Sequence, residues 1–311
     1  GAFAVSAAST AAARASGTVS SPSASAYLER SNPPRSSSRA PGRAGSTSDR
    51  TLTAFTLFRP HFDRWFAEQA VAQGVTLLSG CRVEGLLMRD GAVRGVRVAG
   101  EGDVVEAPLV ITCDGTLSLL AKEAGLHEGF TAGQVALGVR ALYESTEEQV
   151  NERFGLSGRE GATQEFLGCT EGVRGGGFIY TQSETLSVGL VVHLDSLMER
   201  GIPPYELMER FLASAPVALL LKGARLMEYS AHLLPEAGRR MVPRLSAAGL
   251  LVAGDAAGLC YTNGLTQEGM NLAMTSGLIA AQVAAEALAD GDFSARRLAR
   301  YAKELEDSFV R

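Results

Sequence analysis

The sequence predicts an α/β fold with a parallel sheet core and an inserted antiparallel, strand-rich region. Residues 250–253 form a short apolar run bounded by glycines, which is typical of a strand covered on both faces of a parallel sheet. Residues 109–112 form a second such run, and each run ends in a turn that contains an acid and a glycine. Between the two runs, from residue 133 to about 235, apolar segments alternate with glycine-rich turns, which predicts antiparallel strands.

Composition indicates a globular protein. The chain has 311 residues, of which 46% are hydrophobic and 20% charged, enough for one large or two medium domains. The net charge of −5 gives no reason to expect nucleic acid as a partner. The charge-free run at 269–285 contains Asn271, Thr275 and Gln282, so we expect a tightly packed helix and no membrane span.

Residues 1–50 differ from the rest of the chain. Alanine and serine fill 25 of these 50 positions, and six arginines against two acids give a charge of +4, which leaves −9 for the remainder. No hydrophobic period persists, so we expect a disordered leader; an organelle transit peptide, or a fragment or misread reading frame, are alternatives. The predicted domains are this leader, an α/β core at 51–132 and 236–311, and a β-rich domain at 133–235.

The elements follow in order. Pro60 predicts a helix start, and Phe62, Trp65, Phe66, Gln69 and Ala70 predict its buried face. Residues 75–80 and 81–98 then predict alternating strands with a two-residue hairpin turn at Asp90-Gly91. Residues 109–112 return to the main sheet, and a helix is expected from about Thr116.

The later elements are a set of strands and three helices. Segments 134–144, 162–169, 175–182 and 185–194 predict antiparallel strands, with a helix at 204–213. A long helix is expected at about 266–290, packing on the sheet through small residues, and Ser294 is expected to cap an amphipathic helix. The small-residue face comprises Ala273, Gly277, Ala280, Ala281, Ala284 and Leu288.

The turn after residue 253 predicts a ligand site. Gly254 to Gly258 are small except for Asp255, so backbone amides and one carboxylate can approach a hydroxyl-rich ligand closely. A second glycine-rich segment, 263–269, leads into the long helix, whose amino-terminal N–H groups favour negative charge. Small-residue turns of this kind are common in any α/β fold, so the turn alone does not specify the ligand.

Three longer stretches carry a family resemblance. LLVAGDAAGLCYTNGLTQEGMNLAMTSGLIAA resembles the second FAD-binding segment of glutathione-reductase-type flavoproteins, most closely of the FixC and electron-transfer-flavoprotein:quinone oxidoreductase group. LMEYSAHLLPEAG at 226–238 and FRPHFDRWFAEQA at 58–70 resemble the same group, and the likeness extends over about 51–311. It implies a glutathione-reductase-type, Rossmann-like FAD-binding core, incomplete because no strand, G-x-G-x-x-G turn and helix appear in residues 1–50.

The resemblance also implies site residues. Asp255 would bond the flavin ribityl chain or its phosphate end, and the helix start would supply amides to the flavin pyrimidine edge. Arg59 would lie near the flavin or its phosphates, and the Asp114-Gly115 turn near the pyrophosphate or adenine; a surface arginine and a plain structural turn are the alternatives. The predicted cofactor-binding residues are Arg59, Asp114, Gly115, Gly254, Asp255, Ala256, Gly258, Gly264, Thr266, Gly269 and Met270.

No catalytic residue or metal site is predicted. Cys81, Cys113, Cys169 and Cys260 are scattered without ligand spacing, so we interpret them as buried, reduced thiols. His232 and Glu236 could form an acid–base pair, but we interpret His232 as a core residue because flavin electron transfer needs no protein base.

The predicted function is that of a FAD-dependent oxidoreductase of FixC type, a group named for nitrogen fixation. The resemblance implies electrons from an electron-transfer flavoprotein or low-potential donor, and a quinone or a small ferredoxin-like protein as acceptor. The expected location is the cytoplasm, with the inner-membrane surface as an alternative. A geranylgeranyl (prenyl) reductase-like flavoenzyme and a truncated interaction fragment that binds no flavin are the alternative functions.

Overall fold

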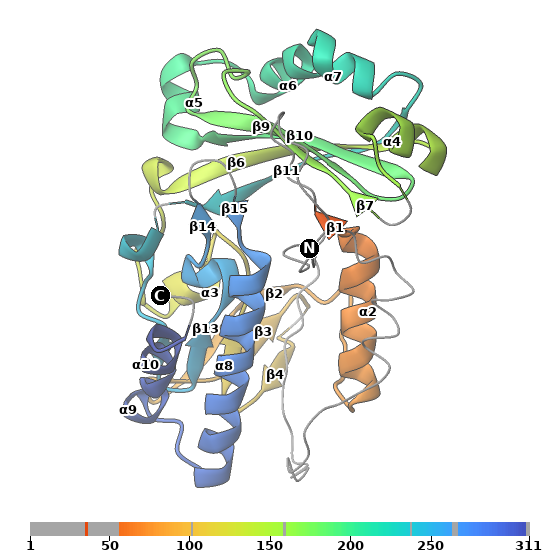
Figure 1. Cartoon of the computed structure of the whole chain (residues 1–311). Coiled ribbons are helices and arrows are strands. Elements are labelled where there is room, and N and C mark those ends of the chain that lie inside the picture. The colour runs from red at the N-terminus through yellow and green to blue at the C-terminus, as the bar shows by residue number, and fades with distance from the viewer. Residues whose placement is uncertain are drawn as a thin grey trace. The chain divides into compact units, whose positions relative to one another are not determined.

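The protein is described from a computed structural model (Figure 1). It describes residues 56–100, 102–157, 160–236, 238–262 and 267–308, with the backbone of strand β1 (Arg35–Ser36). The predicted disordered leader, apart from β1, lies outside the described residues. The described chain divides into two compact units, one of residues 66–136 and 233–308, the other of residues 56–65 and 137–232.

The first unit is built on a small sheet that joins distant segments. Strand β13 (Leu250–Val252) pairs in parallel with β5 (Val110–Thr112), with Leu250 opposite Val110, and antiparallel with β12 (Ser246–Ala247). The sheet order is β12-β13-β5. All three residues of β13 are buried, so the predicted buried strand and its partner are confirmed.

A β-meander forms a second layer of this unit. Its strands are β2 (Val83–Arg89), β3 (Ala92–Val98) and β4 (Val104–Glu106), in that order. The predicted hairpin turn is confirmed, because Asp90 and Gly91 both have positive φ, 51° and 73°. The predicted strand at 75–80 is wrong: the segment is irregular and mostly exposed, so no neighbouring strand in the described chain holds it extended.

Helices complete the first unit. The long helix α8 (Met270–Asp290) contacts residues 254–257 and α10 (Arg300–Glu306), and its buried residues share one hydrophobic core with β5 and β13. Helix α9 (Ala295–Leu298) is capped by Ser294 as predicted, its hydroxyl accepting from Arg297 N. Helix α3 is short, at Leu119–Glu123, and begins three residues later than predicted. The remaining elements are η1 (Ala132–Gln134), η2 (Gly238–Met241), η3 (Gly254–Ala257), β14 (Tyr261–Thr262) and β15 (Gln267–Glu268).

Three expectations about helix surfaces are corrected. Helix α2 (Arg59–Ala72) forms, but it has no buried residue, and Phe66 is 51% exposed. On α8 the buried face holds Leu272, Ser276, Ile279, Ala280, Val283, Ala284 and Ala287, so Ala281 and Leu288 of the predicted face are exposed instead. Helix α8 also has the length and composition of a membrane span, contrary to our expectation. However, 39% of its most apolar 18-residue stretch is buried inside the protein.

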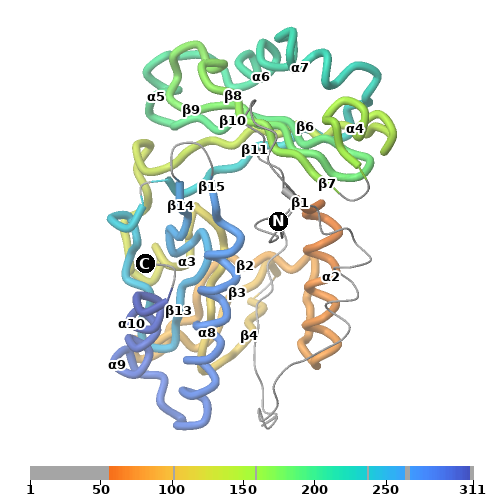
Figure 2. Tube along the Cα trace, viewed as in Figure 1, coloured from red at the N-terminus to blue at the C-terminus, as the bar shows by residue number. Residues whose placement is uncertain are grey.

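The second unit is a five-stranded antiparallel sheet with helices. The strand order is β11-β6-β10-β9-β8, and a further short strand, β7 (Glu160–Gly161), pairs in parallel with β1. The predicted strands and the helix at 204–213 are confirmed; Figure 2 traces the chain into this unit through β6 and out through β11. The elements are β6 (Val135–Glu144), α4 (Glu147–Phe154), β8 (Thr163–Phe166), β9 (Gly175–Thr181), β10 (Thr185–His193), α5 (Leu194–Arg200), α6 (Pro204–Ala213), α7 (Ala215–Leu220) and β11 (Arg225–Pro235).

Candidate functional site

The turns that follow β5 and β13 lie at one edge of the first unit's sheet. The two strands are parallel neighbours, so their carboxyl ends open on the same side, which is where α/β folds bind ligands. Ser118, fully buried in the turn after β5, donates its hydroxyl to Ala256 O at 2.8 Å. This bond ties the two predicted turns together across 138 residues of sequence.

The turn after β13 is held by backbone geometry and by helix α8. Gly254 and Gly258 have left-handed φ values of 64° and 69°, which favour glycine. The N–H of Gly254 donates to Ser276 Oγ at 2.9 Å, and that hydroxyl donates to Ala273 O at 2.8 Å. The predicted small-residue turn therefore forms, and α8 fixes its position.

Asp255 meets the start of α8. It is half-buried, and a Cβ placed on Gly269 would lie 3.8 Å from Asp255 Oδ1, an ordinary van der Waals contact, so the acid lies directly beside Gly269. Gly269 occupies the N-cap position of α8 without a side-chain cap, and Met270 is the first helical residue. Gly264 and Thr266 lie outside the described residues.

Asp114 has a structural task. Its Oδ1 accepts from Thr112 Oγ1 at 2.6 Å and its Oδ2 accepts from Leu120 N at 3.0 Å. The carboxylate thus caps the first turn of α3, which explains why the helix begins at Leu119 and not near Thr116. Gly115 has a φ of 80° and lets the chain reverse directly after this acid.

Arg59 lies in the other compact unit, as the first residue of α2. Its Nε and Nη2 donate to the two carboxylate oxygens of Asp63 at 2.9 and 3.1 Å. Both side chains are about half exposed, so the pair supports the helix only weakly. A role of Arg59 toward a cofactor stays a prediction.

Negative charge gathers on one side of the β13 turn. Burial, against a hydrogen bond from Gln267 and with the nearby carboxylates of Asp255, Glu236 and Glu268, raises the pKa of the Cys260 thiol to about 12. The thiol therefore stays protonated at neutral pH. A cluster of carboxylates accepts hydrogen bonds from hydroxyl groups and repels an unpaired phosphate, so the surroundings of Asp255 suit a polyol chain.

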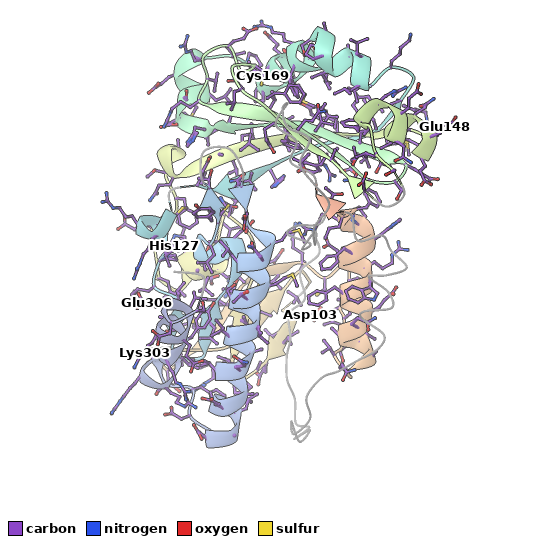
Figure 3. The ribbon with its side chains drawn as sticks, in the orientation of Figure 1. Asp103, His127, Glu148, Cys169, Lys303 and Glu306 are labelled. Carbon is purple, nitrogen blue, oxygen red and sulfur yellow. The ribbon has the colours of Figure 1, made fainter. Side chains whose placement is uncertain are left out.

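Several residues that shape the site escaped the sequence analysis. A Cβ on Gly258 would lie 3.2 Å from Met241 Cγ and 3.6 Å from Phe130 Cζ, so these two side chains form a wall of the turn. His127, labelled in Figure 3, stacks on Phe130 with ring centroids 5.0 Å apart. Ser118 stood in the recognised turn, but no local pattern indicates its bond to Ala256.

Two interpretations of polar residues are wrong. His232 is exposed on β11 and not a core residue; partial burial, with the guanidinium groups of Arg140 and Arg59, lowers its pKa. Cys81 and Cys113 are exposed and only Cys169 and Cys260 are partly covered, so buried thiols were the wrong expectation, although all four are free.

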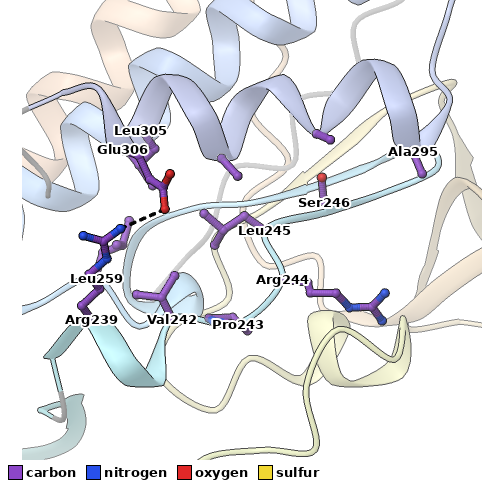
Figure 4. A pocket seen from close by; sticks show the side chains of 12 residues that line it. Arg239, Val242, Pro243, Arg244, Leu245, Ser246, Leu259, Ala295, Leu305 and Glu306 are labelled. Atoms are coloured by element: carbon purple, nitrogen blue, oxygen red, sulfur yellow. Dashed lines mark hydrogen bonds and ion pairs between the residues drawn. The ribbon is translucent and has the colours of Figure 1, made fainter.

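A groove of about 450 Å³ lies elsewhere in the first unit (Figure 4). Its walls come from the segment before β13 and from α9 and α10, and Arg239 at its edge pairs with Glu306 at 3.0 Å. None of the predicted cofactor residues lines it. The candidate site is therefore the edge where the β5 and β13 turns meet α8.

Two curated proteins with similar sequences come from Escherichia coli K12. The chain is 41% identical over 268 residues to "Protein FixC" of Escherichia coli K12, covering 86% of this chain and 62% of that protein. It is 39% identical over 260 residues to "Probable electron transfer flavoprotein-quinone oxidoreductase YdiS" of the same organism, covering 83% and 60%. The chain thus spans about three fifths of the length of these relatives.

Solved structures show the same fold. A geranylgeranyl bacteriochlorophyll reductase-like protein from Thermoplasma acidophilum aligns with a TM-score of 0.69 at 21% identity, covering 84% of this chain and 62% of that one. The myxobacterial FAD-dependent halogenase CndH aligns at 0.62 with 17% identity, covering 92% and 68%. The family model described as "Tryptophan halogenase" matches residues 9–152.

The fold is α/β and matches that of glutathione-reductase-type flavoproteins, as predicted. The sequence identity to FixC and to YdiS, over more than four fifths of this chain, confirms the resemblance drawn from its motifs.

Proposed function

We propose that this chain is the flavin-binding, electron-transferring part of a FAD-dependent oxidoreductase of the electron-transfer-flavoprotein–quinone oxidoreductase type. One observation carries the proposal: a glycine-lined turn with a single acid, Asp255, is fixed against the start of α8 at the carboxyl edge of the sheet. The relatives that share this sequence include one named for that activity.

The residues present fit one half of the cofactor. A half-buried carboxylate beside two small residues, Gly269 and Ala256, leaves room for a ribityl chain whose hydroxyls donate to Asp255. Gly269 gives the first turn of α8 no side-chain cap, and although Asn271 Oδ1 accepts from Leu272 N at 3.0 Å, the N–H groups of Met270 and Asn271 would face the polar edge of a flavin ring. Binding of the adenine nucleotide half, and hence of FAD in particular, is proposed from the family resemblance and not from residues of this site.

The protein's contribution to the reaction is binding and electrostatics. A bound flavin supplies the ability to accept and release electrons singly or in pairs. The chain's own residues orient that group: Ser276 and Ser118 hold the turn, Asp255 bonds hydroxyls, and the α8 dipole stabilises negative charge at its amino terminus. No protein base is required for such electron transfer.

The proposed electron donor is an electron-transfer flavoprotein, and the proposed acceptor is a quinone or a small ferredoxin-like protein. A quinone acceptor would bring the otherwise cytoplasmic protein to the inner-membrane surface. The donor proposal rests on the relatives' names, whereas the ferredoxin-like partner rests on the family resemblance alone.

The test begins with cofactor content. We expect the 311-residue chain to purify with little flavin, and the same chain extended with the regions of Escherichia coli FixC outside the match to purify yellow, with FAD released on denaturation. Chromatography of the released cofactor distinguishes FAD from FMN. The extended protein is then mixed with reduced electron-transfer flavoprotein and a soluble quinone, and quinone reduction is followed.

Two outcomes would contradict the proposal. An extended, folded protein that takes up no flavin would favour a non-flavin interaction role. An extended protein that binds FAD, stays inert toward electron-transfer flavoprotein and reduces a prenyl chain would favour the reductase alternative; the solved reductase-like structure, at 21% identity, shows the fold alone.

A further inference from the structure

Helix α10 places a tyrosine in the same hydrophobic core as the β13 turn. Tyr301 is fully buried, and its core also contains Ala253, Ala256 and Ala257. Helices α8 and α10, which belong to the same unit, contact each other (Figure 1). The ring of Tyr301 is therefore an ordinary core side chain, whereas its hydroxyl is a polar group deep inside the unit.

The Tyr301 hydroxyl lacks a well-formed hydrogen bond. Its oxygen is buried, and no group in the described part of the chain bonds it with ordinary geometry. Burial, together with the nearby Cys113 thiol, raises the pKa of the phenol, so the hydroxyl keeps its proton at neutral pH and remains a donor. A buried hydroxyl without a partner costs free energy, and we therefore expect an acceptor close to it.

Ser276 is the neighbour that fits. A hydrogen-bonding interaction with its side chain opposes the rise in the pKa of Tyr301, so the two hydroxyls lie close together although they are not well aligned. Ser276 Oγ already accepts from Gly254 N at 2.9 Å and donates to Ala273 O at 2.8 Å. A hydroxyl has one proton and two acceptor lone pairs, so one lone pair of Ser276 is left for a donor.

Cys113 is a poorer acceptor for the same proton. Its thiol lies near enough to raise the pKa of the Tyr301 phenol, but sulfur accepts hydrogen bonds weakly and the Cys113 side chain is exposed. The oxygen of Ser276 is therefore the preferred partner of the Tyr301 hydroxyl.

The β13 turn needs support of this kind. Gly254 and Gly258 stand at the two ends of the single turn η3, with φ values of 64° and 69°. Glycine restricts its own backbone least of all residues, so a turn with glycine at both ends is not fixed by its own sequence. Bonds from outside fix it, from Ser118 to Ala256 O and from Gly254 N to Ser276.

We propose that Tyr301 is a positioning residue of the β13 turn, whose hydroxyl donates to the remaining lone pair of Ser276 Oγ. A serine hydroxyl with all its partners in place cannot rotate away, so Gly254 N keeps its acceptor and the adjacent Asp255 keeps its position. The chain of bonds would join α10, α8 and the turn. Its consequence for a cofactor rests on the proposed function, whereas the chain of bonds itself does not.

The first test needs no cofactor. Tyr301→Phe removes the hydroxyl and keeps the buried ring, and amide exchange of the full 311-residue chain is followed by nuclear magnetic resonance. We expect the Gly254 amide to exchange about three- to tenfold faster, the effect of losing one ordinary hydrogen bond. The amide of Ala287, near the other end of α8, should keep its rate. In the Ser276→Ala background, Tyr301→Phe should have no further effect at Gly254.

The control removes a hydroxyl elsewhere. Tyr205 is 57% exposed on α6 in the other unit, so Tyr205→Phe should leave exchange at Gly254 unchanged. An unchanged or slower rate in Tyr301→Phe would overturn the proposal, because a hydroxyl without a partner behaves in that way. Equal acceleration at Gly254 and Ala287 would overturn it too, since it shows a general loss of stability. So would a Gly254 amide that is unprotected in the parent.

A second test uses the extended protein that retains flavin. Tyr301→Phe should raise the flavin Kd by about threefold, and should not raise it in the Ser276→Ala background. If exchange at Gly254 responds but the flavin Kd does not, the positioning role toward the cofactor is overturned. An extended protein that takes up no flavin contradicts the proposed function instead, and the exchange test still decides whether Tyr301 holds the turn.

Discussion

The two turns at the sheet edge use their acids differently. After β5, both oxygens of Asp114 accept hydrogen bonds, from Thr112 and from the amide of Leu120, so the carboxylate builds its own turn. After β13, the supports come from elsewhere: Gly254 N bonds Ser276, and Ala256 O accepts from Ser118. Neither of these two hydrogen bonds involves the side chain of Asp255, the acid of the second turn.

The difference separates two similar sequence motifs by role. Both turns follow a strand end and contain one acid next to a glycine, as Asp114-Gly115 in the first and Gly254-Asp255 in the second. The structure assigns Asp114 to capping, whereas Asp255 lies beside Gly269 at the start of α8, where we propose the flavin site. We therefore expect substitutions of the two acids to affect different quantities.

The largest effect is expected where β13 approaches the meander. Gly249, before β13, has a φ of 72°, and a Cβ there would lie 2.1 Å from Val93 O. Gly249→Ala should lower the free energy of unfolding by about 3 kcal/mol or more, because a backbone atom must move. Gly291→Ala is the control: its φ is 66° but its surroundings are open, so about 1–2 kcal/mol is expected. If urea unfolding shows that both variants lose the same free energy of unfolding, residue 249 does not lie as close to Val93 O as proposed.

The two acids give the next test, in a form of the protein that retains flavin. Asp255→Ala should weaken flavin binding by about 1.5–3 kcal/mol, the usual effect of removing a charged hydrogen-bond partner, and by more than Asp114→Ala does. Asp114→Ala should instead lower the free energy of unfolding by about 1–2 kcal/mol through loss of the α3 cap. Flavin titration and urea unfolding are measured on both variants, and a reversed pattern would exchange the assigned roles.

Ser276 tests what holds the second turn. Ser276→Ala leaves the buried N–H of Gly254 without its acceptor, which should cost about 1–3 kcal/mol of stability. Thr275→Ala, one position away and only half-buried, is the matched control and should change stability by less than about 0.5 kcal/mol. If the two variants unfold alike, the turn does not depend on α8.

Local patterns predicted the elements more reliably than their surroundings. The apolar runs that became β5 and β13, the Asp90-Gly91 hairpin and helix α6 each follow from short-range chemistry. The burial of α2 was predicted incorrectly, and the buried face of α8 was right at Ala280 and Ala284 but wrong at Ala281 and Leu288. Amphipathic spacing shows that a helix has an apolar side but not which element covers it.

For the site, too, the sequence predicted the local turn but not the bonds that position it. Glycines and one acid mark the β13 turn directly in the sequence. The bonds that position it join Ser118 to Ala256 and Gly254 to Ser276, which are 138 and 22 residues apart, and no local rule connects them. The capping role of Asp114 was one of two open interpretations, and the carboxylate distances favour it.

The smallest expected effect concerns pH at the wall of the site. Partial burial lowers the pKa of His127 from its ordinary 6.5, although the nearby Asp114 opposes this, and its Nδ1 accepts from Gly129 N. The folded state therefore favours neutral imidazole, and the stability this contributes is present above about pH 6.5 and lost as the pH falls through the folded pKa. His127→Asn keeps an acceptor but cannot titrate, so its melting temperature should fall less between about pH 7.5 and about pH 5.5 than that of the parent. His232, whose pKa is also lowered, titrates in the same direction, so His232→Asn is measured in parallel. If the melting temperatures of His127→Asn and of the parent fall equally on acidification, His127 does not contribute to the pH dependence of stability.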